Sequence, residues 1–434
     1  MDGEEIEVRD ENNLTSCNIS AASRRPCEKS SYFGLLRLVD RFKFRASRAY
    51  HGAVTVASSS FLFLVVATCA YMFFLPGFHR PTEIETRSLQ LPRSNGVTGS
   101  CNLFLGKWVR DQAYPLYNAS SCPFAERGFD CLGNGRRDGA YAGFRWKPRD
   151  CDIPRFDAGT MLGYLRGKRV VFVGDSLSRT QWESFVCMLM IGVKDVGTVR
   201  EVRGNKITKK IRFLGISFSS YDLRIDFYRS VFLVRSGPIT RRAPKRVKWT
   251  LRLDQMDDIS KEWVDSDVLV FNTGHWWNPN KLFEMGCYFQ VGKLLKLGMP
   301  ITSALEMALR TWASWVDTHI DRNRTTVFIR TFESSHWRSG HGQTSCKVTR
   351  NPLSKIEGKG RSFISDATLR VVKNMTAPVI PLHVTEMGAY RSDAHVGQWG
   401  DDPTVPDCSH WCLPGVPDVW NEILFSLLPR NRNA

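Results

Sequence analysis

The chain has 434 residues, with 60 Lys and Arg against 43 Asp and Glu (net charge +17), 12 cysteines and 42% hydrophobic residues. These values exclude a coiled coil, a collagen and a small disulfide-rich mini-protein, and the length allows one large domain or two ordinary ones. Residues 1–80 hold 10 Lys/Arg and 8 Asp/Glu, so the rest of the chain carries a net charge of +15. We therefore expect the main domain to contact an acidic partner.

The first predicted element is a membrane-spanning helix. No charged Lys, Arg, Asp or Glu occurs between Arg48 and Arg80, and the apolar stretch 53–75 is long enough to cross the ~30 Å hydrocarbon core. We predict a signal-anchor over 49–79; a buried core helix is the alternative, and a cleavable signal peptide fits poorly because the segment starts so late. Basic residues are denser before the span than after it, which places residues 1–48 in the cytosol as a disordered tail.

Residues 80–99 have too few large apolar residues to form a core and are predicted to be a stem. The body, residues 100–430, then lies in a lumen or outside the cell. Nine cysteines fall in it, and in an oxidising compartment we expect disulfides that staple a Cys-rich part (100–155) to the remainder (156–430). Because nine is odd, at least one thiol is unpaired or pairs between chains. The nine are Cys101, Cys122, Cys131, Cys151, Cys187, Cys287, Cys346, Cys408 and Cys412.

Short apolar runs alternate with helical spacing through the body. Buried strands are predicted over 169–173, 268–272, 326–330 and 379–384, and helices over 178–191, 303–319 and 418–428. This alternation predicts an α/β fold, a parallel sheet with helices on both faces. Active sites in such sheets lie at the carboxyl ends of the strands.

The first of these strands runs into Gly174-Asp175-Ser176 and then a helix. Glycine permits a sharp turn, and the serine after it is presented at the strand end beside a helix N-terminus that stabilises an oxyanion. We interpret Ser176 as a candidate nucleophile. The alternative is an ordinary helix N-cap, since Asp and Ser are favoured there.

A serine nucleophile needs a general base that is oriented by an acid. In Asp407-Cys408-Ser409-His410 a carboxylate stands three residues before an imidazole, close enough to bond Nδ1 and leave Nε2 free for the Ser176 proton. Two alternatives remain: Asp407 caps a turn while His410 packs, or Cys408, His410 and Cys412 bind a metal. We expect disulfides rather than a metal there, and no cofactor.

These motifs, with the NTGHWW stretch from Asn272 and the segment NGRRDGAYAGFRWKPRDC, resemble the plant trichome birefringence-like family. Its members are Golgi polysaccharide O-acetyltransferases with a fold similar to SGNH/GDSL hydrolases. The resemblance covers about residues 100–430 and implies a Ser176–His410–Asp407 triad, an acetyl-serine intermediate and a single-pass type II Golgi protein. Two positions depart from the family pattern, Thr180 for the usual Asn and Val396 for the usual Pro. His395, before Val396, lacks the Asp-x-x-His spacing and is not expected to be the base.

Further site residues are less defined. Oxyanion donors are predicted to be the Ser176 N–H and Asn272, although Asn272 before Gly274 also suits a simple turn. Arg179 is retained from the family pattern and is a candidate substrate-binding residue. Trp276 and Trp277 could stack on sugar rings or belong to the core.

The segment 200–252 contains 15 Lys/Arg and 3 Asp/Glu, a charge that attracts anionic polymers. Pectins contain galacturonate whereas xylan and mannan are nearly neutral, so we expect an acidic cell-wall polysaccharide acceptor, in particular rhamnogalacturonan I. A solvated loop or a contact with an anionic Golgi partner are alternatives; nucleic acid is excluded by the predicted topology.

Four functions stay open: a pectin O-acetyltransferase, a xylan or other hemicellulose O-acetyltransferase, a polysaccharide acetylesterase and a non-catalytic pectin-binding protein. The acetyl donor is unknown. A cytosolic acetyl-CoA pool would lie across the membrane from the body, so we expect a partner that delivers acetyl groups.

Overall fold

A computed structural model describes residues 101–239, 243–340, 343–356 and 360–428. All of them belong to one compact unit, Leu91–Ala434. The predicted tail, signal-anchor and stem lie outside the described residues and stay predictions. Within the ranges that the structure describes, no helix is both long and apolar enough to cross a membrane.

A seven-stranded sheet forms the centre of the unit, in the order β15-β12-β9-β3-β6-β5-β4. The strands from β15 to β6 are parallel to their neighbours, which confirms the predicted α/β fold. The sheet is nevertheless mixed rather than wholly parallel, because residues 219–222 form a tight turn between β5 and β6 and a parallel pair needs a longer crossover. The strands are β3 (Arg169–Gly174), β4 (Val199–Glu201), β5 (Phe213–Phe218), β6 (Leu223–Arg229), β9 (Val268–Asn272), β12 (Thr326–Arg330) and β15 (Val379–Leu382).

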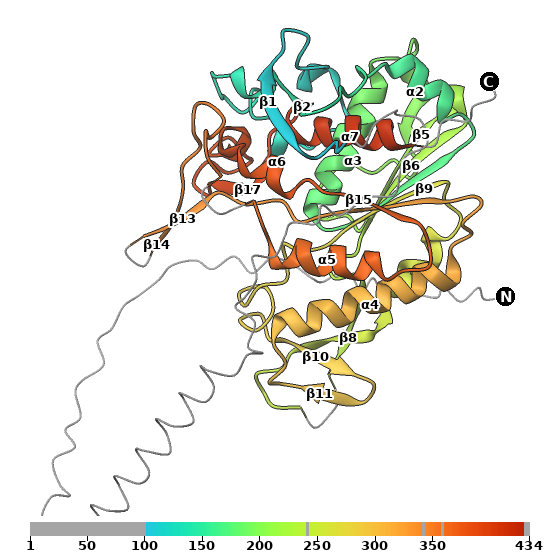
Figure 1. The fold of residues 1–434 in the computed structure, drawn as a ribbon, viewed down its shortest axis with the longest axis vertical. Helices are drawn as coiled ribbons and strands as arrows, with labels where there is room; N and C mark the ends of the chain where they lie inside the picture. Colours follow the sequence, from blue (N-terminus) through green and yellow to red (C-terminus); the bar gives the residue numbers. More distant parts are fainter. Residues whose placement is uncertain (1–100, 240–242, 341–342, 357–359, 429–434) are drawn as a thin grey trace, which may run out of the picture. The chain divides into compact units, whose positions relative to one another are not determined.

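Helices cover both faces of this sheet (Figure 1). On one face lie α2 (Ala158–Tyr164), α3 (Ser176–Met190) and α7 (Val416–Leu427), and on the other α4 (Ile301–His319) and α5 (Phe363–Lys373). Successive strand residues point to opposite faces, so Val170 and Phe172 join the core with α3 and α7, whereas Val171 and Val173 join the core with α4 and α5. The three predicted helices and four predicted strands are confirmed, with ends that differ by two residues or fewer.

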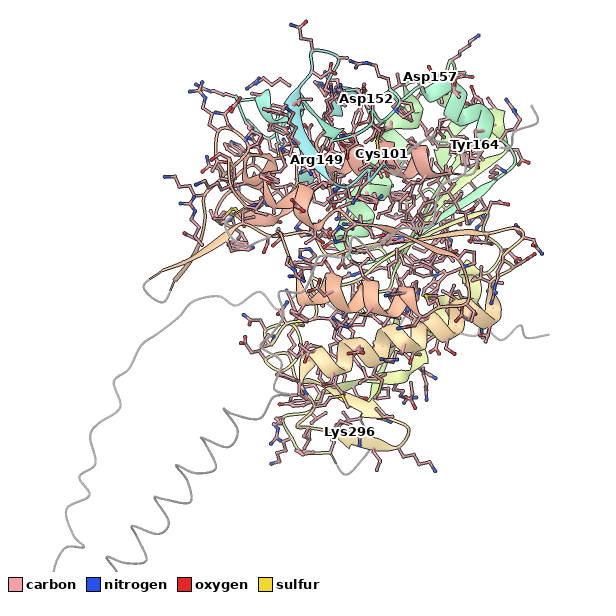
Figure 2. All side chains as sticks on the ribbon, in the orientation of Figure 1. Cys101, Arg149, Asp152, Asp157, Tyr164 and Lys296 are labelled. Atoms are coloured by element: carbon pink, nitrogen blue, oxygen red, sulfur yellow. A yellow bond between two sulfur atoms is a disulfide. The ribbon has the colours of Figure 1, made fainter. Side chains whose placement is uncertain are left out.

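A second, four-stranded sheet packs against α4, in the order β11-β10-β8-β7. Figure 2 shows Lys296, on β11, at the opposite end of the unit from Cys101. Three two-stranded sheets complete the fold. The remaining elements are β1 (Gly106–Arg110), β2 (Phe144–Pro148), β7 (Val234–Pro238), β8 (Trp249–Met256), β10 (Cys287–Val291), β11 (Leu294–Lys296), β13 (Trp337–Gly340), β14 (Gln343–Cys346), α6 (Thr385–Ala389), β16 (His395–Gly397) and β17 (Asp407–Trp411).

Four disulfides tie the chain together, as the cysteine count predicts. Two of them join the Cys-rich part to the rest: Cys122–Cys187 reaches α3, and Cys131–Cys412 reaches the segment after β17. The other two are Cys101–Cys151 and Cys346–Cys408. The odd cysteine is Cys287, which is buried as a free thiol, and burial raises its pKa.

Candidate active site

The Gly-Asp-Ser turn lies between β3 and α3 and is held by the neighbouring strand β9. A Cβ on Gly174 would lie 2.0 Å from Asn272 Oδ1, so only glycine fits this close approach. Asp175 Oδ1 accepts hydrogen bonds from Leu177 N (3.0 Å) and Asn272 Nδ2 (3.0 Å), and its Oδ2 accepts one from His275 N (3.4 Å). Asp175 is therefore the helix N-cap, which leaves the Ser176 hydroxyl available for other chemistry.

The structure brings together the three residues predicted to form the triad. His410 Nε2 lies 2.6 Å from Ser176 Oγ, and His410 Nδ1 lies 2.6 Å from Asp407 Oδ2. Asp407 Oδ1 accepts two further bonds, from the backbone N–H groups of Ser409 (2.8 Å) and His410 (3.0 Å). The His410 and Asp407 side chains remain 24% and 31% exposed, so the site is open to solvent and to a substrate.

Asp407 and His410 shift each other's pKa in opposite directions. Burial raises the pKa of the Asp407 carboxyl, but the His410 imidazole and the backbone hydrogen bonds lower it more, to well below its ordinary value. Burial lowers the pKa of His410, and the Asp407 carboxylate reverses this and raises it above the ordinary value. Asp407 thus stays ionised and accepts a hydrogen bond from Nδ1–H, which leaves the unprotonated Nε2 as the proton acceptor for Ser176.

The Cys-rich part contributes directly to the surroundings of His410, a role that sequence reasoning missed. The Phe129 ring stacks on the imidazole with a centroid distance of 5.7 Å. Phe129 O accepts a hydrogen bond from Leu413 N (2.9 Å), and the Cys131–Cys412 disulfide lies beside this contact. Only the cysteine spacing gave a signal that these two segments meet.

His395, which was not expected to be the base, is buried and contacts the backbone of His410. Its Nδ1 donates a hydrogen bond to the His410 carbonyl oxygen (2.9 Å), and its ring stacks on Trp411 at a centroid distance of 4.0 Å. His395 Nε2 is bonded to His336 Nδ1 (2.7 Å). Burial holds the pKa of His395 well below its ordinary value. No sequence motif indicates the contact between His395 and His336.

Two predicted substrate-binding residues occupy structural positions instead. Arg179 is buried, forms ion pairs with Glu126 and Glu183, and lies over the Phe129 ring. Trp277 is only 3% exposed, and its Nε1 donates a hydrogen bond to Thr273 Oγ1 (2.9 Å). Other residues of the protein contact the side chains of Arg179 and Trp277 and leave them almost no exposed surface. The prediction that they bind substrate is therefore corrected.

Trp276 differs from its neighbour because it is half-buried. Asn272 ends β9 and is buried, and its amide oxygen accepts the Asp175 N–H (3.2 Å). The Asn272 side chain thus reaches across to the serine turn rather than stabilising only its own turn. Its second Nδ2 hydrogen makes no bond to Asp175, and its service as an oxyanion donor stays a prediction.

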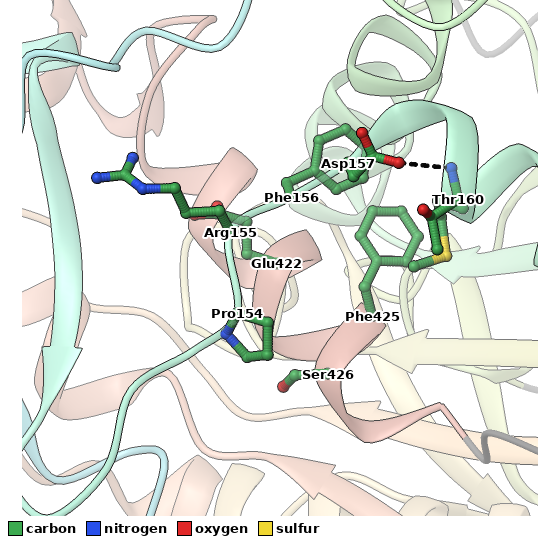
Figure 3. A pocket seen from close by; sticks show the side chains of 9 residues that line it. Pro154, Arg155, Phe156, Asp157, Thr160, Glu422, Phe425 and Ser426 are labelled. Carbon is green, nitrogen blue, oxygen red and sulfur yellow. Dashed lines mark hydrogen bonds between the residues drawn. The ribbon is translucent and has the colours of Figure 1, made fainter. Parts of the chain in front are cut away.

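The rival metal site is excluded for its proposed ligands, because Cys408 and Cys412 are both disulfide-bonded. Among the described residues, no cluster of His, Cys, Asp or Glu is suited to hold a metal. A hollow of about 60 Å³ lies between α2 and α7, where Asp157 caps Thr160 N at 2.7 Å (Figure 3). Its lining includes none of the triad residues, and it is too small for a sugar ring.

A Gly-Asp-Ser turn at the carboxyl edge of a parallel sheet, with an Asp-x-x-His strand beside it, defines an SGNH-type serine acyl-transfer protein. Residues 153–427 match the PC-Esterase model, described as the "GDSL/SGNH-like Acyl-Esterase family found in Pmr5 and Cas1p", and residues 99–152 match the PMR5 N-terminal domain. The chain belongs to this family.

Among its relatives, trichome birefringence-like 7 of Arabidopsis thaliana is 55% identical over 375 residues, covering 86% of this chain and 84% of the relative. Trichome birefringence-like 6 of the same plant is 41% identical over 359 residues, covering 79% and 75%. Trichome birefringence-like 9, also from Arabidopsis thaliana, is 40% identical over 355 residues, covering 77% and 85%. The resemblance seen in the sequence is confirmed, and it supports an acyl-esterase or acetyltransferase role.

Proposed function

We propose that this protein is a polysaccharide O-acetyltransferase that works through an acetyl group on Ser176. The observation that carries the proposal is the continuous hydrogen-bonded chain from Ser176 Oγ through His410 to Asp407. A hydroxyl so placed can lose its proton to Nε2 as it attacks a carbonyl, and the imidazolium that forms lies against a carboxylate.

The reaction has two balanced halves. His410 accepts the Ser176 proton, Ser176 Oγ forms a bond to the acetyl carbonyl carbon of a donor, and the donor's leaving group departs with that proton. His410 then accepts the proton of a sugar hydroxyl, whose oxygen attacks the acetyl-serine; the new ester leaves, and Ser176 Oγ recovers the proton. The Ser176 N–H at the start of α3, with Asn272 beside it, is the proposed donor set for the oxyanion.

For the acceptor we propose an acidic cell-wall polysaccharide, rhamnogalacturonan I. Support comes from the +12 net charge of residues 200–252. A Golgi membrane location with one type II span, and a partner that delivers acetyl groups, are proposals supported by the apolar stretch 53–75 and by the family resemblance.

A polysaccharide acetylesterase is the second candidate. It is favoured by the exposure of the His410 and Asp407 side chains, 24% and 31%, because water that reaches the acyl-enzyme would hydrolyse it. The two functions share the first half-reaction and differ in the nucleophile of the second.

The test is to trap the intermediate and then follow its fate. The full-length protein is incubated with p-nitrophenyl acetate, and mass spectrometry should find the acetyl group on the Ser176 peptide. Ser176→Ala should lose the adduct and all transfer, whereas Ser220→Ala, a matched change at an exposed serine, should lose neither.

Acceptor and water then compete for the adduct. Rhamnogalacturonan oligomers should become acetylated; release of free acetate alone would assign the esterase, and transfer only to neutral xylan would reject the acidic acceptor. A wild-type protein without an adduct, or Ser176→Ala with undiminished transfer, would rule out the acetyl-serine mechanism.

A further inference from the structure

The segment that follows β6 crosses the carboxyl edge of the sheet next to the serine turn. Arg229, the last residue of β6, is in register with Gly174 of β3. Ser230 N donates a hydrogen bond to Gly174 O (2.9 Å), and Thr273 Oγ1 donates one to Val231 O (2.8 Å). The segment is therefore tied to the carboxyl ends of β3, which leads into Ser176, and of β9, which ends at Asn272.

Arg229 is a half-buried cation that forms no ion pair with a carboxylate of the described residues. Burial lowers its pKa, nearby Arg179 lowers it further, and Asp175 raises it, which places the guanidinium in the electrostatic field of the serine turn. Its hydrogen bond is to the backbone oxygen of Lys209 (3.3 Å), and no carboxylate within the described ranges pairs with it. Asp175 is already held by three N–H donors.

A guanidinium that is partly withdrawn from water without a counter-ion carries a desolvation cost. A carboxylate supplied by a ligand would offset this cost through a short, bidentate, charge-assisted pair. Arg229 thus has the chemistry of an anion-recognition group rather than that of a structural ion pair, which is the situation of Arg179.

An aromatic ring and a second cation lie beside Arg229. The Arg229 Cζ atom is 5.6 Å from the centroid of the Trp276 ring, and Lys281 Nζ is 5.2 Å from the same centroid. Phe232 packs edge-on against Trp276 at 6.1 Å and fixes its orientation. Both cations lie over the Trp276 ring, which holds them near each other. A sugar that carries a carboxylate suits this pair, because the carboxylate can pair with the two cations.

We propose that Arg229, Trp276 and Lys281 form a uronate subsite beside Ser176. The subsite binds a uronic acid residue of the acceptor and so holds the polymer next to the acetyl-serine. It rests on the proposed function and deepens it, since it assigns the preference for an acidic acceptor to three residues instead of to the general charge of the chain.

The test perturbs the carboxylate and the cation separately. Full-length wild-type protein is given rhamnogalacturonan oligomers with free carboxylates and the same oligomers after methyl esterification. Because an esterified carboxyl cannot pair with Arg229, kcat/KM for the esterified oligomers should be lower by about 10- to 100-fold. In Arg229→Gln the free-acid oligomers should lose this advantage.

Two further variants sharpen the comparison. Lys281 is exposed, so Lys281→Gln should reduce the preference for the free acid by only about two- to fivefold. Lys296→Gln removes the same charge on β11 and leaves Arg229, Trp276 and Lys281 unchanged, so it should keep the full preference.

Equal use of the two oligomers by the wild-type protein would overturn the subsite, and this comparison does not depend on the folding of any variant. A preference that survives in well-folded Arg229→Gln would overturn it as well. In both cases an intact acetyl adduct on Ser176 leaves the proposed function standing, whereas a wild-type protein that forms no adduct removes the function and the subsite together.

Discussion

Replacing Asp407 with Asn tests the orientation of the catalytic imidazole. Asp407 Oδ1 accepts hydrogen bonds from Ser409 N and His410 N, so the single oxygen of an Asn would be retained on that side. Its NH₂ group would then face His410 Nδ1 and donate to it. The imidazole is forced into the tautomer with its proton on Nε2, which can no longer accept the proton of Ser176.

The expected loss is large because the wrong tautomer removes the base while the fold is kept. We expect the rate of acetyl-Ser176 formation to fall about 10⁴-fold, equivalent to about 5 kcal/mol of activation free energy. Asp407 also raises the pKa of His410, and wild-type activity should decline as the pH falls through that raised value. In the variant the pKa drops, so the acid limb of the residual activity should move to lower pH.

The assay is stopped-flow acylation of the full-length protein by p-nitrophenyl acetate from pH 5 to 9. Asp402→Asn is the matched control, since Asp402 is exposed and its side chain accepts hydrogen bonds from Thr404. A rate for Asp407→Asn within tenfold of the wild-type rate, with unchanged pH dependence, would refute the assignment of Asp407 as the residue that orients His410.

Three other changes have expected outcomes. Burial raises the pKa of Glu422 from 4.5 to about 7, so the folded state retains a proton that the unfolded state releases. The free energy of unfolding should therefore fall by up to about 3 kcal/mol between pH 4.5 and 7. Thermal melts of Glu422→Gln should lack this loss of stability over the same pH range. Arg179→Gln leaves the buried Glu183 carboxylate without its partner and should cost about 3–5 kcal/mol in denaturant unfolding; a raised KM for the acceptor at unchanged stability would restore its substrate role. The double variant Cys131→Ser, Cys412→Ser should lose about 2–5 kcal/mol of stability and most acylation activity, and wild-type activity in it would show that the disulfide does not help to position His410.

The central strands and the triad could be predicted because their signals are local. The run from Arg169 to Val173 is apolar because both faces of β3 are covered by helices. Gly-Asp-Ser and Asp-x-x-His are short motifs, and each indicates the role of its residues from neighbours no more than three positions away. The predictions for Ser176 and His410 needed only the assumption that the two motifs meet.

Strand β6 was missed because it is not a continuous apolar run: Leu223, Ile225 and Phe227 alternate with charged residues. Asp226 lies in its middle and is fully buried, which is tolerated only because Arg169 and Arg224 pair with it at 2.8 and 2.9 Å. A sequence window shows a charged residue that argues against a buried strand. The partner that neutralises Asp226 from the neighbouring strand is visible only in the fold.

Contacts with distant parts of the chain also explain why Arg179 and Trp277 were wrongly predicted to bind substrate. Arg179 follows the serine by three positions, and nothing local indicates that Glu126 of the Cys-rich part reaches it. Trp276 and Trp277 are adjacent and chemically identical in sequence, but Trp277 is buried in the core whereas Trp276 is half-buried and packs against that core. Arg229 was not predicted as a site residue, because nothing in the sequence separates it from the other basic residues among the fifteen in 200–252. Its contacts are visible only in the fold.

Because of the bridge between Cys131 and Cys412, we expect the proposed activity to depend on oxidation of the chain. A chain synthesised where thiols remain reduced would contain Ser176, His410 and Asp407, but β17 would lack its covalent anchor to the segment that carries Phe129. We expect such a chain to be inactive until Cys131 and Cys412 are oxidised to the disulfide. Deleting residues 99–152 removes Cys131, so the remaining hydrolase-like part could not form this disulfide even in an oxidising compartment.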